Sequence, residues 1–181
     1  YWMVEPHTRR EEIDYQTVAN EIRKKKIPGL KLSGELGRSH GSLLKNLKQL
    51  RVLDLSKTNV GGTTIRDYIR YSMPGLQRLN LASTNMAWKG IAMLRQKELR
   101  VLNLRNTKVD NRVLEHIKQF RQLRKLDLRN TAITGKDLVE LKHLEHLSEV
   151  QITLSNFDDD GLEAIVKLKD EPWIPSLSDL D

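Results

Sequence analysis

A small number of polar residues have types and spacings that could support chemistry. His143 and His146 lie three residues apart, a separation at which two imidazoles on one helical turn can hold a metal ion. No third ligand is evident in the sequence, so we interpret them as a surface pair. Residues 158–161, Asp-Asp-Asp-Gly, superficially resemble a calcium loop. They lack its alternating ligands and distant glutamate, and acids in this position are typical of a helix N-terminus.

The sequence shows no motif for nucleotide binding or covalent catalysis. Residues 34–41 are rich in glycine, but they contain neither the lysine of a phosphate-binding loop nor the glycine spacing of a dinucleotide fold. Serine, histidine and aspartate all occur, without a motif that would position them as a triad. We therefore expect a protein that is not an enzyme, with no catalytic residues, no resident metal or cofactor and no small-molecule substrate.

The charge of the chain is unevenly distributed. The 181 residues carry a formal net charge of +7, yet residues 145–181 contain ten acids and only two bases. Residues 1–144 contain twenty-nine bases and fourteen acids. The basic part is suited to an acidic protein surface, nucleic acid or anionic lipid, whereas the acidic end is not.

The composition also bears on location. No apolar run approaches the roughly 20 residues that a transmembrane helix needs, so we expect no transmembrane segment. The chain has no cysteine, which excludes disulfides, thiol catalysis and thiolate metal sites. We expect an intracellular protein, in the cytoplasm or inside an organelle.

One pattern, Leu-x-x-Leu-x-Leu-x-x-Thr, recurs along the chain. Its four strong copies begin at Leu50, Leu76, Leu99 and Leu123. A degenerate copy starts at Leu147 and a fainter one at Ile27, so successive copies start 23 to 26 residues apart. Leucines two apart point to the same face of a short strand. Apolar residues three apart then predict helical stripes. The stripes are Leu114, Ile117 and Phe120; Leu138, Leu141 and Leu144; and Leu162, Ile165 and Leu168.

This pattern resembles the leucine-rich repeat family, in a threonine-type variant of about 23–26 residues. The resemblance implies an α/β solenoid, a short curved horseshoe with a parallel sheet of about six strands on its concave face and helices on its convex face. Thr58, Thr84, Thr107 and Thr131 occupy the position where the family usually has asparagine or cysteine. That residue bonds backbone groups in the turn after the strand, and a hydroxyl can do the same.

The resemblance covers residues 27–168, which we expect to form the solenoid. Residues 1–26 would be an N-terminal segment and cap helix, and residues 169–181 a C-terminal cap or tail, because the terminal faces of a solenoid are apolar. Thr8 and Glu11 form a capping box that predicts a helix over residues 8–26; its alternative role is a basic amphipathic contact with membrane or RNA. The two extra residues of the second repeat predict a longer helix, with a convex bulge as the alternative.

The resemblance implies that residues between and beside the inward leucines lie on the concave face. Its central ladder is Lys31, Asp54, Asn80, Asn103, Asp127 and Gln151, and the next is Ser33, Ser56, Ala82, Arg105, Arg129 and Thr153. We expect the partner-binding residues to be Arg51, Arg78, Arg100, Asn103, Arg105, Arg124, Lys125, Asp127 and Arg129. Equivalent residues of neighbouring strands lie about 5 Å apart, so Arg100 should neighbour Arg124, and Arg105 should neighbour Arg129.

Clustered arginines repel one another without a counterion, and each can grip a carboxylate or a phosphate. The sequence therefore predicts a non-enzymatic protein–protein interaction module or scaffold that binds an acidic partner on a basic concave face. No aromatic residue lies in the ladders, which argues against binding of single-stranded nucleic acid. The alternative is a structural subunit of a large organellar or ribonucleoprotein assembly that contacts the phosphate backbone of RNA. A further alternative is a solvated face neutralised by internal Asp–Arg pairs.

Overall fold

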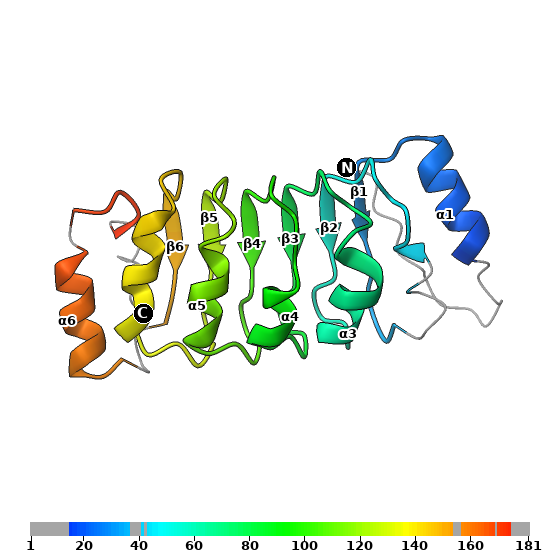
Figure 1. Cartoon of the computed structure of the whole chain (residues 1–181). Coiled ribbons are helices and arrows are strands. Elements are labelled where there is room, and N and C mark those ends of the chain that lie inside the picture. Colours follow the sequence, from blue (N-terminus) through cyan, green and yellow to red (C-terminus); the bar gives the residue numbers. More distant parts are fainter. Residues whose placement is uncertain (1–14, 37–40, 42, 154–156, 169, 175–181) are drawn as a thin grey trace.

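The computed structural model describes residues 15–36, 41, 43–153, 157–168 and 170–174 (Figure 1). Six strands of three residues each form one parallel sheet in chain order. The strands are β1 (Gly29–Lys31), β2 (Val52–Asp54), β3 (Arg78–Asn80), β4 (Val101–Asn103), β5 (Lys125–Asp127) and β6 (Glu149–Gln151). Each connection returns over the same face of the sheet, which the helices cover. The predicted α/β solenoid is confirmed.

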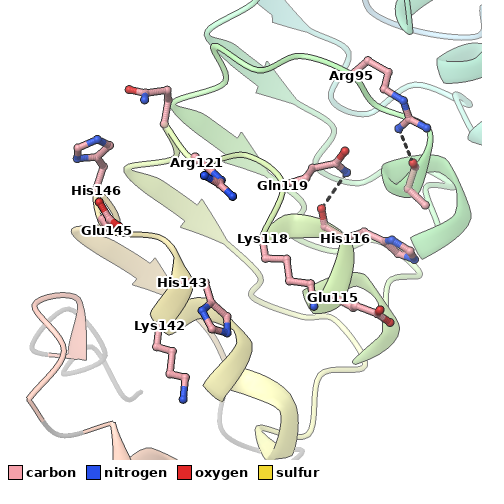
Figure 2. A pocket seen from close by; sticks show the side chains of 12 residues that line it. Arg95, Glu115, His116, Lys118, Gln119, Arg121, Lys142, His143, Glu145 and His146 are labelled. Carbon is pink, nitrogen blue, oxygen red and sulfur yellow. Dashed lines mark hydrogen bonds between the residues drawn. The ribbon is translucent and has the colours of Figure 1, made fainter.

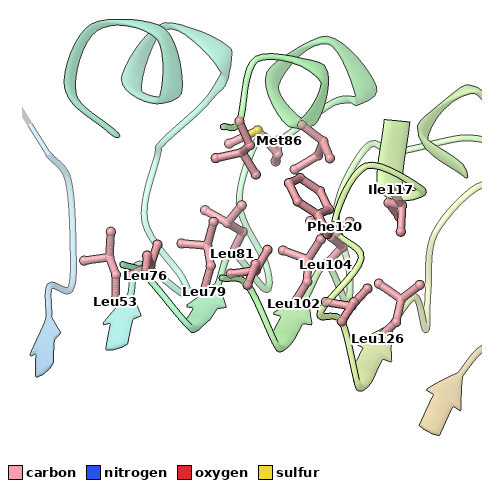
Figure 3. Packing of buried hydrophobic residues seen from close by; sticks show 14 of the residues in the cluster. Leu53, Leu76, Leu79, Leu81, Met86, Leu102, Leu104, Ile117, Phe120 and Leu126 are labelled. Carbon is pink, nitrogen blue, oxygen red and sulfur yellow. The ribbon is translucent and has the colours of Figure 1, made fainter. Parts of the chain in front are cut away.

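The middle residue of every strand is buried and aligns with the middle residue of the next strand. Leu53 pairs with Leu79, and Leu79 pairs with Leu102, so the side chains form a continuous apolar column. Figure 3 shows this column packed against residues of the return segments, among them Met86 and Phe120. No repeat could bury its own leucines alone, and stacking therefore supplies most of the driving force for folding.

The return segments contain helices of different types. They are α3 (Gly62–Thr64), the π-helix η1 (Ile65–Ile69), α4 (Trp88–Ala92), α5 (Arg112–Ile117), the 3₁₀-helix η2 (Lys136–His143) and α6 (Asp159–Lys167). In η2, Leu138 and Leu141 are buried, as a spacing of three residues requires in a helix with three residues per turn. Asp158 caps α6 by accepting a hydrogen bond from the Gly161 nitrogen at 2.9 Å, which is the predicted role of this acidic run.

The predicted stripe of the last helix is wrong at one position. Leu162 is 49% exposed, and Gly161 and Ala164 of α6 are buried in its place. A side chain at Gly161 would collide with the carbonyl oxygen of Thr134, so α6 turns its small residues toward the preceding repeat. This close approach of two backbones cannot be deduced from the spacing of leucines.

The extra length of the second repeat lies in its helix. α3 and η1 run on without a break from Gly62 to Ile69, which confirms the predicted longer helix, in a wider π form. Buried Gln96, from the next repeat, donates from Nε2 to the carbonyl oxygens of Ile69 at 3.0 Å and Arg70 at 3.2 Å. A single side chain thus satisfies carbonyl groups at the end of the widened helix.

Apolar side chains from the first and the last segments that the structure describes are part of the core. Helix α1 (Tyr15–Lys24) buries Ala19 and Ile22 against the first repeat, and Trp173 is 1% exposed. The helix that we predicted over residues 8–26 is therefore seen from residue 15. Its capping box at Thr8 and Glu11 lies outside the described residues.

The turn after each of the four strong strands is held by its threonine. The buried hydroxyls of Thr58, Thr84, Thr107 and Thr131 each donate to the carbonyl oxygen three residues earlier, at 2.6 to 2.7 Å. This is the predicted backbone bond of the turn. The residue before each threonine has a positive φ of 53–58°. Two of these residues, Asn106 and Asn130, are of the type that best tolerates this conformation.

The turn into α5 is held by a charged pair. The Asp110 carboxylate accepts hydrogen bonds from the Arg112 backbone nitrogen at 3.1 Å and from Arg112 Nε at 2.9 Å. The side-chain hydrogen bond from Arg112 lowers the pKa of Asp110, although desolvation opposes the shift. The guanidinium also lies 4.9 Å from the centre of the Trp88 ring, which stacks on His116 at 5.5 Å. The pair therefore links α4 to α5.

We predict that Thr107→Val lowers the free energy of unfolding by about 1–3 kcal/mol, because the buried carbonyl of Leu104 loses its donor. Thr107→Ser keeps the hydroxyl and should cost about 1 kcal/mol or less, the value of one methyl group. Urea denaturation of the two variants measures the difference. Equal losses would show that the hydroxyl contributes nothing.

We predict a pH-dependent effect of Asp110→Asn. A carboxyl whose pKa is lowered by folding stabilises the protein fully above its unfolded pKa of about 3.9, and the contribution disappears as the pH falls through the lowered value. Asp110→Asn should therefore reduce Tm at pH 7, and the two chains should converge as the pH falls well below 3.9. Thermal melts monitored by circular dichroism measure this. A gap in Tm that is the same at both pH values would contradict the assignment.

Candidate functional site: the concave face

The face of the sheet turned away from the helices is here called the concave face, and the side chains on it and along its borders form four columns. The central column is the predicted ladder, since Asp54, Asn80, Asn103 and Asp127 pair in register across β2 to β5. The residues just before the strands form an edge column. Its members are Arg51, Gln77, Arg100, Arg124 and Ser148, linked by backbone hydrogen bonds of 2.8–2.9 Å. Arg100 and Arg124 are therefore neighbours, as predicted.

The remaining concave residues form two further columns. Arg78 aligns with Val52 and Val101, and that column continues to Lys125 and Glu149. Beyond the strands, the chains stay parallel. The Leu104 nitrogen donates to the Asp127 oxygen at 2.8 Å, and the Asn106 nitrogen donates to the Arg129 oxygen at 2.8 Å. Arg105 and Arg129 are consequently adjacent in the fourth column, which also agrees with the prediction.

The central column serves the backbone of its own turns. Side-chain oxygens of Asp54, Asn80, Asn103 and Asp127 each accept a hydrogen bond from the nitrogen two residues later, at 2.8 to 3.1 Å. These are the side-chain-to-backbone bonds that aspartate and asparagine make in turns. The structure thus gives Asn103, one of the predicted site residues, a role in holding its own loop.

Two of the predicted bases are neutralised within the face. Arg129 binds Asp127 through two parallel hydrogen bonds, from Nε at 3.1 Å and from Nη2 at 2.8 Å. Lys125 forms an ion pair with Glu149 of the next strand. The internal Asp–Arg pairing considered in the sequence analysis is therefore present at one point. The Lys125–Glu149 pair was missed, although the 24-residue spacing of the repeats aligns these two residues.

The other predicted bases are exposed. Arg78, Arg100, Arg105 and Arg124 make no ion pair with any described residue, and the side chain of Arg51 makes only a 3.4 Å hydrogen bond to the Lys48 carbonyl. Four of these five arginines lie at the amino ends of consecutive strands, one each for β2, β3, β4 and β5. We call Arg51, Arg78, Arg100 and Arg124 the arginine edge. Arg105 lies at the opposite ends of the strands.

Nowhere in residues 15–36, 41, 43–153, 157–168 and 170–174 do three or more histidine, aspartate or glutamate side chains gather as a metal site would require. His143 and His146 are both exposed. Over those ranges, too, the helices are either too short or too polar to cross a lipid bilayer.

Comparison with known proteins identifies the repeats. One leucine-rich repeat model matches residues 122–144 and a second matches residues 143–166. The two models together cover the fifth repeat, which begins at Leu123, and most of the degenerate copy that follows. No curated protein matches the sequence.

Solved structures with a similar fold come from very different organisms. A plant peptide hormone receptor, solved in complex with RGF2, is 20% identical, with a TM-score of 0.47 over 71% of this chain and 22% of the receptor. An internalin from Listeria monocytogenes is 16% identical, with a TM-score of 0.47 over 78% of this chain and 49% of that one. The tropomodulin C-terminal domain from Caenorhabditis elegans is 13% identical, with a TM-score of 0.45 over 85% and 90%.

This chain spans only about a fifth of the plant receptor and half of the internalin. At such identities the likeness gives no indication of a shared partner. The assignment rests instead on the threonine-anchored repeats, their parallel register and the two family models. Residues 122–166 thus match leucine-rich repeat models, and the described residues fold as a leucine-rich repeat solenoid.

Proposed function

We propose that this module binds an acidic segment of another protein along the arginine edge of its concave face. The observation that carries the proposal is the contrast between bases on the same sheet. Lys125 and Arg129 have acidic partners, whereas Arg78, Arg100 and Arg124 have none among the described residues. Unpaired like charges on adjacent strands repel one another, and bound carboxylates would relieve that repulsion.

The spacing of the arginine edge suits an extended chain. Neighbouring strands lie about 4.8 Å apart, so four consecutive strands span about 15 Å. A polypeptide rises about 3.3 Å per residue, and about five residues would cover that distance. Each guanidinium can hold a carboxylate through two parallel hydrogen bonds, which adds geometric selectivity to the attraction between charges. A rigid sheet keeps the entropic cost of binding low, because the arginine backbones are already in place.

The other predicted residues would act in different ways. Arg105 is exposed and would contact a segment that crosses the face toward the far ends of the strands. Asn103 and Asp127 hold the turns that carry Arg105 and Arg129, so we propose positioning roles for them. Lys125 and Arg129 would contribute to the field of the face but not grip the partner directly, since each is occupied by an acid.

The described concave columns favour protein over nucleic acid. They contain no aromatic side chain on which a base could stack, and three acids, Asp54, Asp127 and Glu149, lie among the bases. An RNA backbone presents a negative charge at every nucleotide to these acids. The experiment below therefore compares an acidic peptide with RNA, the partner expected of a subunit of a ribonucleoprotein assembly.

We predict that Arg100→Gln/Arg124→Gln weakens binding of a fluorescein-labelled peptide with four alternating glutamates by about tenfold, in line with the loss of two charge-assisted hydrogen-bond pairs. Fluorescence anisotropy at pH 7.5 and low salt measures the affinity. The matched control, Lys125→Gln/Arg129→Gln, removes the same formal charge from the same face. It should cost only about twofold, because these bases are already paired.

Equal losses in the two variants would mean that only net charge matters, and the arginine edge would not be the contact site. An eight-nucleotide oligouridine is the second probe. The parent chain could bind oligouridine more tightly than the peptide, and Arg100→Gln/Arg124→Gln could abolish that binding. This pair of results would identify a phosphate backbone, and not an acidic protein segment, as the partner of the arginine edge. Circular dichroism of each variant establishes that it is folded.

A further inference from the structure

A hollow lies outside the concave face, where the return segments lead into β5 and β6 (Figure 2). It has a volume of about 1120 Å³ and is lined by the end of α4, by α5, by η2 and by the turns before the two strands. We call this hollow the histidine groove, because it contains three of the five histidines of the chain, His116, His143 and His146. None of its lining residues belongs to the four concave columns.

Several basic groups of the groove lack an acidic partner among the described residues. Arg121 and Lys142 are exposed and form no ion pair with any described residue, and the same holds for His143 and His146. Figure 2 shows Arg121 and His143 extending into the space between α5 and η2. Lys118 differs, because it pairs with Glu140 at 3.3 Å. These exposed, unpaired groups come from two successive return segments and face one hollow.

One wall of the groove is fixed. The His116 ring stacks on Trp88 with an angle of 6° between the two planes, and Arg112 lies over the same indole. Gln119 donates from Nε2 to the His116 carbonyl oxygen at 2.8 Å, and Arg95 donates to the Ala92 carbonyl oxygen at 2.9 Å (Figure 2). The groove is thus formed on one side by side chains held in place, which reduces the ordering cost of binding.

We infer that the histidine groove is a second binding site for an acidic protein segment, and that it binds more tightly as the pH falls. Carboxylates would meet Arg121, Lys142 and the imidazoles. The lining also includes Glu115 and Glu145, which would repel a polymer that carries a phosphate at every unit. A polypeptide can place its backbone N–H groups against these two glutamates and its own acids against the bases, so the mixed lining favours a protein segment.

The pH dependence follows from the chemistry of imidazole. Histidine is the side chain that gains a positive charge between about pH 8 and pH 5, and carboxylates brought beside it favour the charged form. Binding of an acidic segment would therefore take up protons. Other charged side chains surround the imidazoles. The basic ones are Arg95, Arg112, Lys118, Arg121 and Lys142. The acidic ones are Glu115, Glu140 and Glu145.

The experiment uses the acidic peptide probe on the full chain carrying Arg100→Gln/Arg124→Gln, so that a failure of the arginine edge does not affect the result. Anisotropy is measured at pH 5.5 and pH 8.0 at the same ionic strength, where the glutamates of the probe stay mostly ionised. We expect about tenfold tighter binding at pH 5.5, from two to three added charges at an exposed site. Adding His143→Gln/His146→Gln should reduce that ratio to about twofold.

Two controls make the result specific. Replacing His7 and His40, the two histidines outside the described residues, by glutamine removes as many imidazoles and should leave the tenfold ratio intact. Lys108→Gln/Lys136→Gln changes two exposed lysines and should weaken peptide binding less than Arg121→Gln/Lys142→Gln, which removes the same charge from the groove. The inference is overturned if the ratio survives His143→Gln/His146→Gln, if the chain shows no pH dependence, or if oligouridine shows the ratio and the peptide does not.

Discussion

Every other feature of this molecule depends on how the chain leaves its strands. After the last inward leucine the backbone must turn back over the core, where a carbonyl without a donor would be costly. A buried threonine hydroxyl supplies that donor in four successive repeats, beside a residue with positive φ. Because the turn is the same each time, each strand starts in register with the previous one. The spacing of the concave columns is a consequence of this hydrogen bond.

The two proposed binding surfaces use this regularity differently. The arginine edge takes one side chain from each of four consecutive strands, and its spacing therefore follows that of the sheet. Arg51, Arg100 and Arg124 come from the column before the strands, and Arg78 comes from the next column. The histidine groove lies between return segments that are not equivalent, the α-helix α5 and the 3₁₀-helix η2. A partner on the first surface would meet a periodic row of charges, and one on the second a single irregular hollow.

The sequence predicts what repeats and does not predict what occurs once. Leucines two residues apart and the threonine that follows predict the strands and their register. They also predict that Arg100 and Arg124 are adjacent. The sequence does not predict the type of helix, because apolar residues are spaced by three in both the α-helix α5 and the 3₁₀-helix η2. Exposure of Leu162 depends on how closely Gly161 approaches a neighbouring carbonyl. Pairing of Lys125 with Glu149 follows from the repeat alignment, but the groove depends on side chains from several different turns.

The widened helix of the second repeat has a consequence for the outer contour of the solenoid. Two additional residues are absorbed by a π-helix, Gln96 satisfies its terminal carbonyls, and Leu53 still pairs with Leu79. The additional residues on the helical side therefore leave the register of β2 and β3 unchanged. The outer contour of one repeat can therefore change in length while the strand register beside it stays the same.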